Sequence, residues 1–399
     1  MALQKVPGKM IELDNQANSD VVYFDGTNWV RLEKGEADDI LTVNEDATAP
    51  QWGPLCVFPG TQYGYVCGGF LGKWPDCVSG PNVAYGSQIQ KISLTTDGNS
   101  TDIGDILSAR RNQSGHSSST HGFVVGGYVS QAPSSLNIIE RFSFTTDGNS
   151  TDWADLTTSL NTSSVPASSC THGFSFGGQN GTNTNTKIID KFPFASQTNA
   201  TDWAECSVAQ YAGAGCSSEL NGYACGSVQH VAPGVPSGTV LNNIDKYPYA
   251  TQTNSTDIGN LVLLRYGGAG VSSETDGYIV GGLTVGTNPG NSAPIWDRSN
   301  IDKFSFASGT QNAVDHGDLP LESSAGAHGG TGMSGETHGY HAGGIYSWNS
   351  SNHQYAREQI EKFAYASNVT ASDVGDLVQV GSTVSSVCFG MNGGSGHQF

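Results

Sequence analysis

Histidines recur at one position of this sequence, where His121, His172 and His338 each stand directly before a glycine. Imidazole is a common ligand of transition metals and transfers protons near neutral pH, so a repeated histidine suggests either chemistry. The same position of a repeat falls on a different structural unit each time, which keeps the three rings apart. We therefore expect these histidines to hold tight turns in which the following glycine supplies a positive φ, and we predict no metal there.

Two identical turns offer the carboxylate and amide oxygens that Ca²⁺ binds. They read DGNSTD at Asp97–Asp102 and at Asp147–Asp152. Both lack a third acidic ligand and a closing glutamate, and the corresponding QTNATD and QTNSTD lose the first aspartate. Because Asn, Gly, Ser and Thr are also the residues of hairpin turns, we expect turns here and no calcium.

Other chemistry has less support in the sequence. The densest group of His and Tyr (His328, Tyr340 and His341) falls in one repeat, whereas a copper site needs such ligands to converge. A carboxylate pair could cleave glycosides, but the spacing of the acidic residues selects no pair. We predict no catalytic residue, no cofactor and no metal. An enzyme that degrades polysaccharide stays open as the alternative.

The elements that must position these residues form a repeat of six copies, spaced by roughly 50–60 residues. Each copy contains a glycine pair, then a segment such as IERFSF or IDKFPF, and then one such as TDWADL or TDIGNL. The pairs are Gly68-Gly69, Gly126-Gly127, Gly177-Gly178, the degenerate Gly226-Ser227, Gly281-Gly282 and Gly343-Gly344.

Each copy predicts four short β-strands. Residues 139–144 mix apolar and polar side chains as a half-buried strand does, and residues 123–125 are an apolar run that the glycine pair stops. A run of Gly, Ala and Ser precedes it, which suits a strand at a crowded central axis. The sequence therefore predicts an all-β propeller of six four-stranded blades.

The end of the chain predicts how the ring closes. Residues 380–390, with the sequence VGSTVSSVCFG, match the small-residue first strand of the other copies. We expect Ser382–Phe389 to supply the inner strand of blade one, beside Gly64–Gly69. A seventh blade, in which VSSVCFGMNGG pairs with the N-terminal VVYFDGTNWVRL, stays open as the alternative.

The loops between the second and third strands vary most between copies. They are short in copies two and three and long in copies one, four, five and six. Insertions on one face of a repeat protein usually mark its binding face, and aromatic rings beside polar groups suit sugars. We predict ligand contacts from Trp74, Tyr85, Trp296, Asp297, Arg298, Trp348, His353 and Tyr355. Packing within the loops themselves is the other explanation for these aromatics.

Composition narrows the class of protein. The net charge is −19 and no basic stripe occurs, so we expect no nucleic-acid partner. No apolar run of about 18 residues predicts a membrane span, and the N-terminus lacks the apolar core of a signal peptide. The eight cysteines include Cys67 and Cys225 at a buried-strand position, and we expect no disulfide network.

Residues 1–53 differ from the repeats. Val21–Leu32 predicts a hairpin around Asp25 and Gly26, and residues 33–53 predict an acidic connector. Such a short segment buries little apolar surface alone. We therefore expect residues 1–53 to be an attachment or oligomerisation module, completed by a partner or by sister chains, and residues 54–399 to form the propeller.

The order of small-residue strand, apolar strand with Gly-Gly, variable loop and aromatic strand resembles the kelch repeat. The recurring motifs IDKFxF and TDxGDL resemble those of propeller-bearing virion proteins of tailed, especially marine, bacteriophages. The N-terminal segments MALQKVPGKMI and YFDGTNWVRLEKG resemble the N-terminal modules of tail fibres. The resemblance implies a virion structural protein, made in the host cytoplasm, that binds other virion proteins through residues 1–53. It also implies a homo-oligomer, such as a trimer, whose propeller recognises a host-surface glycan or receptor.

Overall fold

The computed structural model describes residues 20–35, 39–43, 48–54, 62–71, 84–130, 134–162, 164–182, 184–229, 238–285, 295–297, 299–307, 312–320, 329–348, 353–378, 387–388 and 394–395. The chain divides into two compact units, Met1–Val57 and Phe58–Phe399. All regular structure in these ranges is β-strand, which confirms the predicted fold class. None of the described residues belongs to a helix that could cross a membrane.

The smaller unit contains two hairpins. The predicted hairpin is confirmed as β1 (Val21–Phe24) paired with β2 (Trp29–Leu32). Its turn is held by Asp25, whose Oδ1 accepts the backbone N–H groups of Thr27 and Asn28, both at 2.7 Å. The segment expected to be a connector instead contains a second hairpin, β3 (Asp39–Val43) with β4 (Pro50–Pro54).

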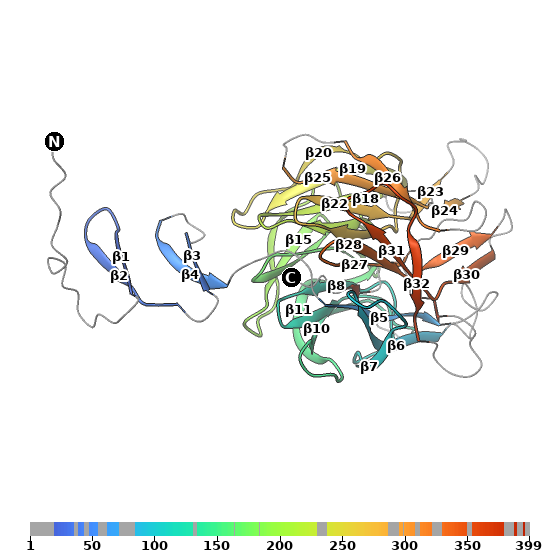
Figure 1. The fold of residues 1–399 in the computed structure, drawn as a ribbon, viewed down its shortest axis with the longest axis horizontal. Coiled ribbons are helices and arrows are strands. Elements are labelled where there is room, and N and C mark those ends of the chain that lie inside the picture. Colours follow the sequence, from blue (N-terminus) through green and yellow to red (C-terminus); the bar gives the residue numbers. More distant parts are fainter. Residues whose placement is uncertain are drawn as a thin grey trace. The chain divides into compact units, whose positions relative to one another are not determined.

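The larger unit is a six-bladed β-propeller (Figure 1). Each blade is an antiparallel sheet that begins with a short strand at the axis and adds its further strands outward.

Blade one contains β34 (Gly394–Ser395) and β33 (Val387–Cys388), which both pair with β5 (Tyr63–Leu71), then β6 (Ala84–Ser93) and β7 (Thr101–Asp105); blade two contains β8 (Ser114–Ser117), β9 (His121–Val125), β10 (Leu136–Ser143) and β11 (Thr151–Thr162). Blade three contains β12 (Val165–Ser168), β13 (His172–Phe176), β15 (Ile188–Pro193) and β16 (Thr201–Glu205); blade four contains β17 (Ala214–Ser217), β18 (Asn221–Gln229), β19 (Thr239–Pro248) and β20 (Thr256–Asn260). Blade five contains β21 (Ala269–Ser272), β22 (Asp276–Val280), β25 (Asn300–Ser305) and β26 (Val314–Asp318); blade six contains β27 (Thr331–Ser334), β28 (His338–Ala342), β31 (Gln359–Ala364) and β32 (Ser372–Asp376).

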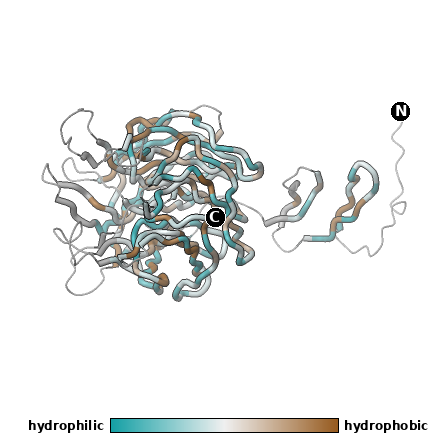
Figure 2. The backbone as a smooth tube through the Cα atoms, turned by 180° about the vertical axis from the view of Figure 1, so that it is seen from behind, coloured by the Kyte–Doolittle hydropathy of each residue, from teal (hydrophilic) through white to brown (hydrophobic). Residues whose placement is uncertain are grey.

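Neighbouring blades are packed together by stacked aromatic rings. The ring of the second strand in one blade lies face to face with the ring that follows the third strand of the next blade. Centroids are 4.7 Å apart for Tyr65–Phe144 and Phe123–Phe194, 4.8 Å for Phe174–Tyr249 and Tyr223–Phe306, and 4.9 Å for Tyr278–Tyr365. The core consists of separate clusters, each formed by residues of adjacent blades. Along the chain, apolar stretches of the propeller alternate with polar ones (Figure 2).

The glycine after each repeated histidine has a different role from the one predicted. Gly122 lies inside β9, opposite Phe142 of β10, and a Cβ there would come within 2.3 Å of the Phe142 ring. Gly173 stands in the same relation to Phe192, also at 2.3 Å. The expected positive φ is therefore wrong here, because the glycine is needed to make room for a cross-strand aromatic ring. Positive φ occurs instead at the glycine pair, with 61° at Gly126 and 105° at Gly127.

The inner strands approach one another by backbone contact. A Cβ on Gly215 would lie 1.8 Å from the carbonyl oxygen of Pro166, and one on Gly270 would lie 1.8 Å from that of Gly215. Serines link the inner strands of blades two to six in series. Backbone N–H groups donate to the serine Oγ of the next blade in the order Ser117, Ser168, Ser217, Ser272 and Ser334, at 3.0–3.2 Å. The predicted small-residue inner strand is therefore a steric requirement.

The C-terminal segment closes the ring, as expected, but in a different register. Gly394 and Ser395 of β34 pair with Cys67 and Val66 and lie between the inner strands of blades two and six. Within the expected segment Ser382–Phe389, only Val387 and Cys388 are described, and they pair farther along β5 with Leu71 and Phe70. Both stretches are rich in small residues, so composition could not choose between them. The seven-blade alternative is wrong, because β33 pairs with β5 and β1 pairs with β2.

Cysteines largely follow the prediction. Cys67 and Cys225 are buried and free, as are Cys206 and Cys216. Cys170 is disulfide-bonded, although the sequence led us to expect no disulfide network.

Removing residues 379–399 should lower the melting temperature by at least about 6 °C, because β5 loses its inner partner and an unpaired strand edge is exposed. Differential scanning calorimetry of the shortened chain measures this. Replacing Val314, which is 61% exposed, with serine is the control and should shift melting by no more than about 1 °C. An unchanged melting curve for the shortened chain would contradict the closure.

Candidate functional site

The candidate site lies on the face that carries the glycine pairs and the links between blades, such as residues 107–113. We call it the loop face. Blades four, five, six and one are consecutive around the ring, and each extends its middle strands there as a hairpin.

In blades five and six the hairpins are separate sheets, β23 (Leu283–Val285) with β24 (Ile295–Asp297) and β29 (Ile345–Trp348) with β30 (His353–Ala356) (Figure 1). In blades four and one they are the ends of β18–β19 and β5–β6, where Val228 pairs with Val240 and Phe70 with Tyr85. In blades two and three the corresponding hairpins are shorter, each with a single β-bridge, Tyr128 with Ser135 and Gln179 with Asn185. There β14 (Gln179–Asn180) joins them by pairing with β11.

The structure places six of the eight predicted ligand residues on these hairpins. Trp296 and Asp297 lie in β24, Trp348 in β29, and His353 and Tyr355 in β30. β24 and β29 are neighbours, so the segments that carry Trp296 and Trp348 come together. Tyr85 lies in β6, while Trp74 and Arg298 are outside the described residues. Ligand binding by all eight stays a prediction.

Sequence reasoning missed a cation between two aromatic rings at the seam of blades one and two. The guanidinium carbon of Arg111 lies 5.5 Å from the ring centroid of Tyr85 and 5.0 Å from that of Tyr128. The two rings meet edge to face with centroids 6.2 Å apart. Arg111 and Tyr128 are fixed by two backbone hydrogen bonds, of 3.1 and 2.8 Å, and burial raises the pKa of Tyr85. No short motif could have found this group, because each residue comes from a different connection.

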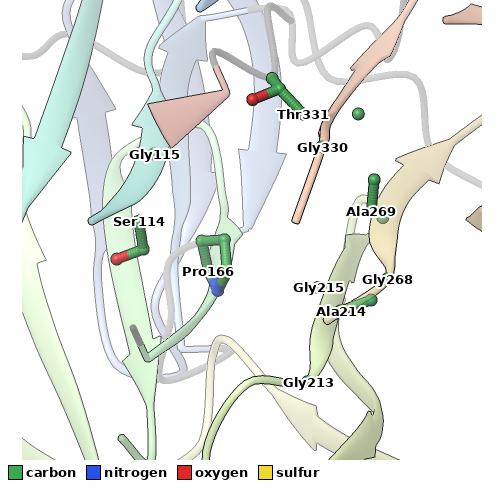
Figure 3. A pocket seen from close by; sticks show the side chains of 12 residues that line it. Ser114, Gly115, Pro166, Gly213, Ala214, Gly215, Gly268, Ala269, Gly330 and Thr331 are labelled. Atoms are coloured by element: carbon green, nitrogen blue, oxygen red, sulfur yellow. The ribbon is translucent and has the colours of Figure 1, made fainter. Parts of the chain in front are cut away.

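The propeller axis is almost filled. A cavity of about 20 Å³ is lined by the starts of five inner strands, including Ser114, Pro166 and Thr331 (Figure 3). A water molecule needs roughly 10–15 Å³ measured in this way, so the cavity has room for about one water. A sugar is too large for this cavity.

The acidic residues of the third strands are structural. The same position is occupied by Gln90, Glu140, Asp190, Asp245, Asp302 and Glu361, all of them buried. Glu140 pairs with Arg110 and accepts the N–H of Leu107 at 2.9 Å. Asp302 pairs with Arg265 at 2.6 Å and accepts the N–H of Val262 at 2.8 Å. These two carboxylates therefore join a blade to the link from the previous blade.

The DGNSTD turns also serve the ring. Oδ1 of Asn149 accepts the N–H of Asp105, and Oδ1 of Asn99 accepts that of Asp376, each at 3.0 Å. These amide oxygens thus bind the neighbouring blade, and the turn prediction is confirmed.

The repeated histidines lie at the turns before the second strands. Nδ1 of His121, His172 and His338 lies 2.8 Å from Oγ1 of the preceding threonine. Burial, together with Lys191, lowers the pKa of His172 to about 4. Within the described residues, no three His, Cys, Asp or Glu side chains form a group that could hold a metal.

Tyr340 and His341 do not converge. The Tyr340 hydroxyl donates to the carbonyl of Leu94 at 2.7 Å, in the next blade. His341 Nδ1 lies 2.9 Å from a carboxylate oxygen of Glu361, which also pairs with Arg357. Successive residues of a strand point to opposite faces, which keeps this tyrosine and histidine apart. His328 lies outside the described residues.

Comparison with known proteins supports the fold alone. No protein-family model and no curated protein sequence matches this chain. A solved structure titled "Structure of YjhT" is similar, with a TM-score of 0.53 over 67% of this chain and 84% of that one, at 12% identity. The class of protein that fold and comparison define is therefore a six-bladed β-propeller.

Asp190 provides a test of these interblade carboxylates. Its oxygens accept the N–H and hydroxyl of Thr157, at 3.1 and 2.7 Å, while burial raises its pKa to about 6. Since this exceeds the ordinary value of 3.8, the folded protein binds more protons than the unfolded chain between these pH values. The contribution of Asp190 to the free energy of unfolding is therefore largest below pH 4 and falls as the pH rises to about 6.

Asp190→Asn should remove this dependence. Relative to wild type, the variant should gain stability as the pH rises from 4 to 6 and be at least as stable at pH 7.5. Urea unfolding at intervals of one pH unit measures the difference. Asp152→Asn, at an exposed position of β11, is the control. Parallel stability curves for Asp190→Asn and wild type would contradict the prediction.

Proposed function

We propose that this chain is a structural protein of a tailed-bacteriophage particle and that its propeller recognises a glycan on the host surface. The repeat motifs and the N-terminal motifs resemble those of virion proteins, and this resemblance supports the phage origin. The six-bladed fold supports a display role, since a propeller is a rigid platform for variable loops.

The contiguous hairpins of the loop face are the observation that carries the proposal. A repeat protein without a ligand on this face has no need to extend four neighbouring blades and leave the other two short. Because the axis holds about one water, the rim is the surface at which a sugar fits. Aromatic residues such as Trp296 and Trp348 suit the apolar CH face of a sugar ring.

Attachment to the particle falls to residues 1–53 in this proposal. Isolated two-stranded hairpins are marginally stable, so β1–β2 and β3–β4 favour a partner. Phe24 and Trp29 form a cross-strand pair with centroids 5.5 Å apart, yet both are more than half exposed. We propose that other virion proteins, or sister chains in an oligomer such as a trimer, cover this pair.

Replacing both Trp296 and Trp348 with alanine should weaken binding to host cells at least about tenfold, which corresponds to roughly 1.4 kcal/mol. Melting temperature should change little if the rings contact ligand. Cell-binding assays with the labelled full chain measure the effect. Thr182→Ala, in the short connection of blade three, is the control. Wild-type binding by the double variant would assign these tryptophans to loop packing, and turnover of host polysaccharide by the purified protein would favour the enzyme instead.

Deleting residues 1–53 should prevent incorporation into particles while residues 54–399 still fold. Quantitative mass spectrometry of purified particles measures occupancy, and calorimetry of the shortened chain reports folding. Phe24→Ser with Trp29→Ser in the full chain should reduce occupancy in the same direction. Full occupancy of the shortened protein would refute this attachment role.

A further inference from the structure

On the loop face, the guanidinium of Arg111 lies against two tyrosine rings, those of Tyr85 and Tyr128. At the corresponding position, two other links between blades have a tyrosine. In the links before blades four and five, Tyr211 and Tyr266 form single backbone bridges with Val228 and Leu283. In the link before blade two, Arg111 forms the same bridge with Tyr128. The backbone is therefore equivalent in the three links, while the side chain has changed from an aromatic group to a cation.

We propose that Tyr85, Arg111 and Tyr128 bind the acidic group of a charged sugar, a carboxylate or sulfate, on the glycan that the loop face recognises. This inference rests on the proposed function and adds the chemical class of the ligand. A guanidinium that lies over aromatic faces keeps its donors in its own plane, where they match the two oxygens of an anion. The tyrosine rings provide apolar surface for the sugar to which the acidic group is attached.

The group is rigid enough to act as a binding site. Arg111 and Tyr128 are held by their two backbone hydrogen bonds, and Tyr85 pairs with Phe70 in the β5–β6 hairpin. The Tyr85 hydroxyl is protonated at neutral pH, as tyrosine hydroxyls ordinarily are, and can donate a hydrogen bond. Tyr85 on a strand and Arg111 and Tyr128 in a β-bridge hold a ligand geometry better than residues at loop tips do.

The negative net charge of the chain disfavours non-specific binding of acidic sugars. A chain of net charge −19 repels a polyanion in general, so adventitious binding of acidic polymers is disfavoured. At physiological ionic strength this repulsion is screened beyond about 8 Å, whereas contact with Arg111 is not. Binding of an acidic sugar by this group should depend on the guanidinium of Arg111, which lies against both tyrosine rings.

The test uses the full chain and three immobilised polymers: polygalacturonate for carboxylates, dextran sulfate for sulfates, and neutral dextran. Wild type should bind at least one acidic polymer and bind dextran at least tenfold more weakly. Arg111→Gln should lose at least tenfold in affinity for the acidic polymer, and Arg111→Lys should recover part of it, since a lysine keeps the charge without the paired donors.

Arg141→Gln is the matched control, because Arg141 also lies over an aromatic ring, that of Trp153 at 3.7 Å, but away from the loop face. It should bind as wild type does. Methyl-esterified polygalacturonate tests the wild-type protein without any substitution and should bind at least tenfold more weakly than the acid form, if the carboxylate is the preferred group.

Failure to bind either acidic polymer, or equal binding by Arg111→Gln and wild type, would overturn the inference. Host-cell binding that still depends on Trp296 and Trp348 would then leave the proposed glycan recognition standing. If neither the acidic polymers nor host cells are bound in this way, the inference and the proposed glycan recognition are both rejected.

Discussion

The structure depends on the stacking of one aromatic ring on another at each seam between blades. Five seams have ring centroids 4.7–4.9 Å apart. At the sixth, Tyr340 meets Leu94 and donates a hydrogen bond to its carbonyl, so the same contact continues across the closure of the ring. An aromatic side chain buries about 150–250 Å², and a single blade has no second layer against which to bury it. Each blade is thus stable only beside its neighbours, and the ring must close.

This packing determines which residues can stand nearer the axis. The second strands need glycine opposite the large rings of the third strands, as at Gly122 and Phe142. The inner strands need glycine where the backbone of the next blade approaches to contact distance, as at Gly215 and Gly270. Serine hydroxyls then satisfy N–H groups that would otherwise be buried without a partner. The inner strands consequently leave a cavity of only about 20 Å³ between them, and the proposed recognition is therefore assigned to the rim.

Charged residues have one role inside the propeller and another on the loop face. Inside the propeller, acidic residues of the third strands bind the links from preceding blades, so these carboxylates maintain the architecture and recur in every copy except the first. On the loop face, a cation replaces an aromatic residue in one link only among the three that share its backbone bridge. Repetition therefore marks structural roles in this chain, whereas departures from the repeat mark the candidates for function.

The sequence by itself determined the number of copies, the strands within each, the six-bladed ring and the role of the C-terminus in closing it. These follow from local patterns, because strand length, side-chain alternation and small-residue runs act between residues close in the chain. Only the tertiary structure decided which C-terminal residues pair with β5, since two stretches of similar composition compete and the partner strand selects one. It also decided the role of Gly122, which faces an aromatic ring of another strand, and it assembled Tyr85, Arg111 and Tyr128. Those three residues belong to three different connections, and only the packing of blade one against blade two brings them together.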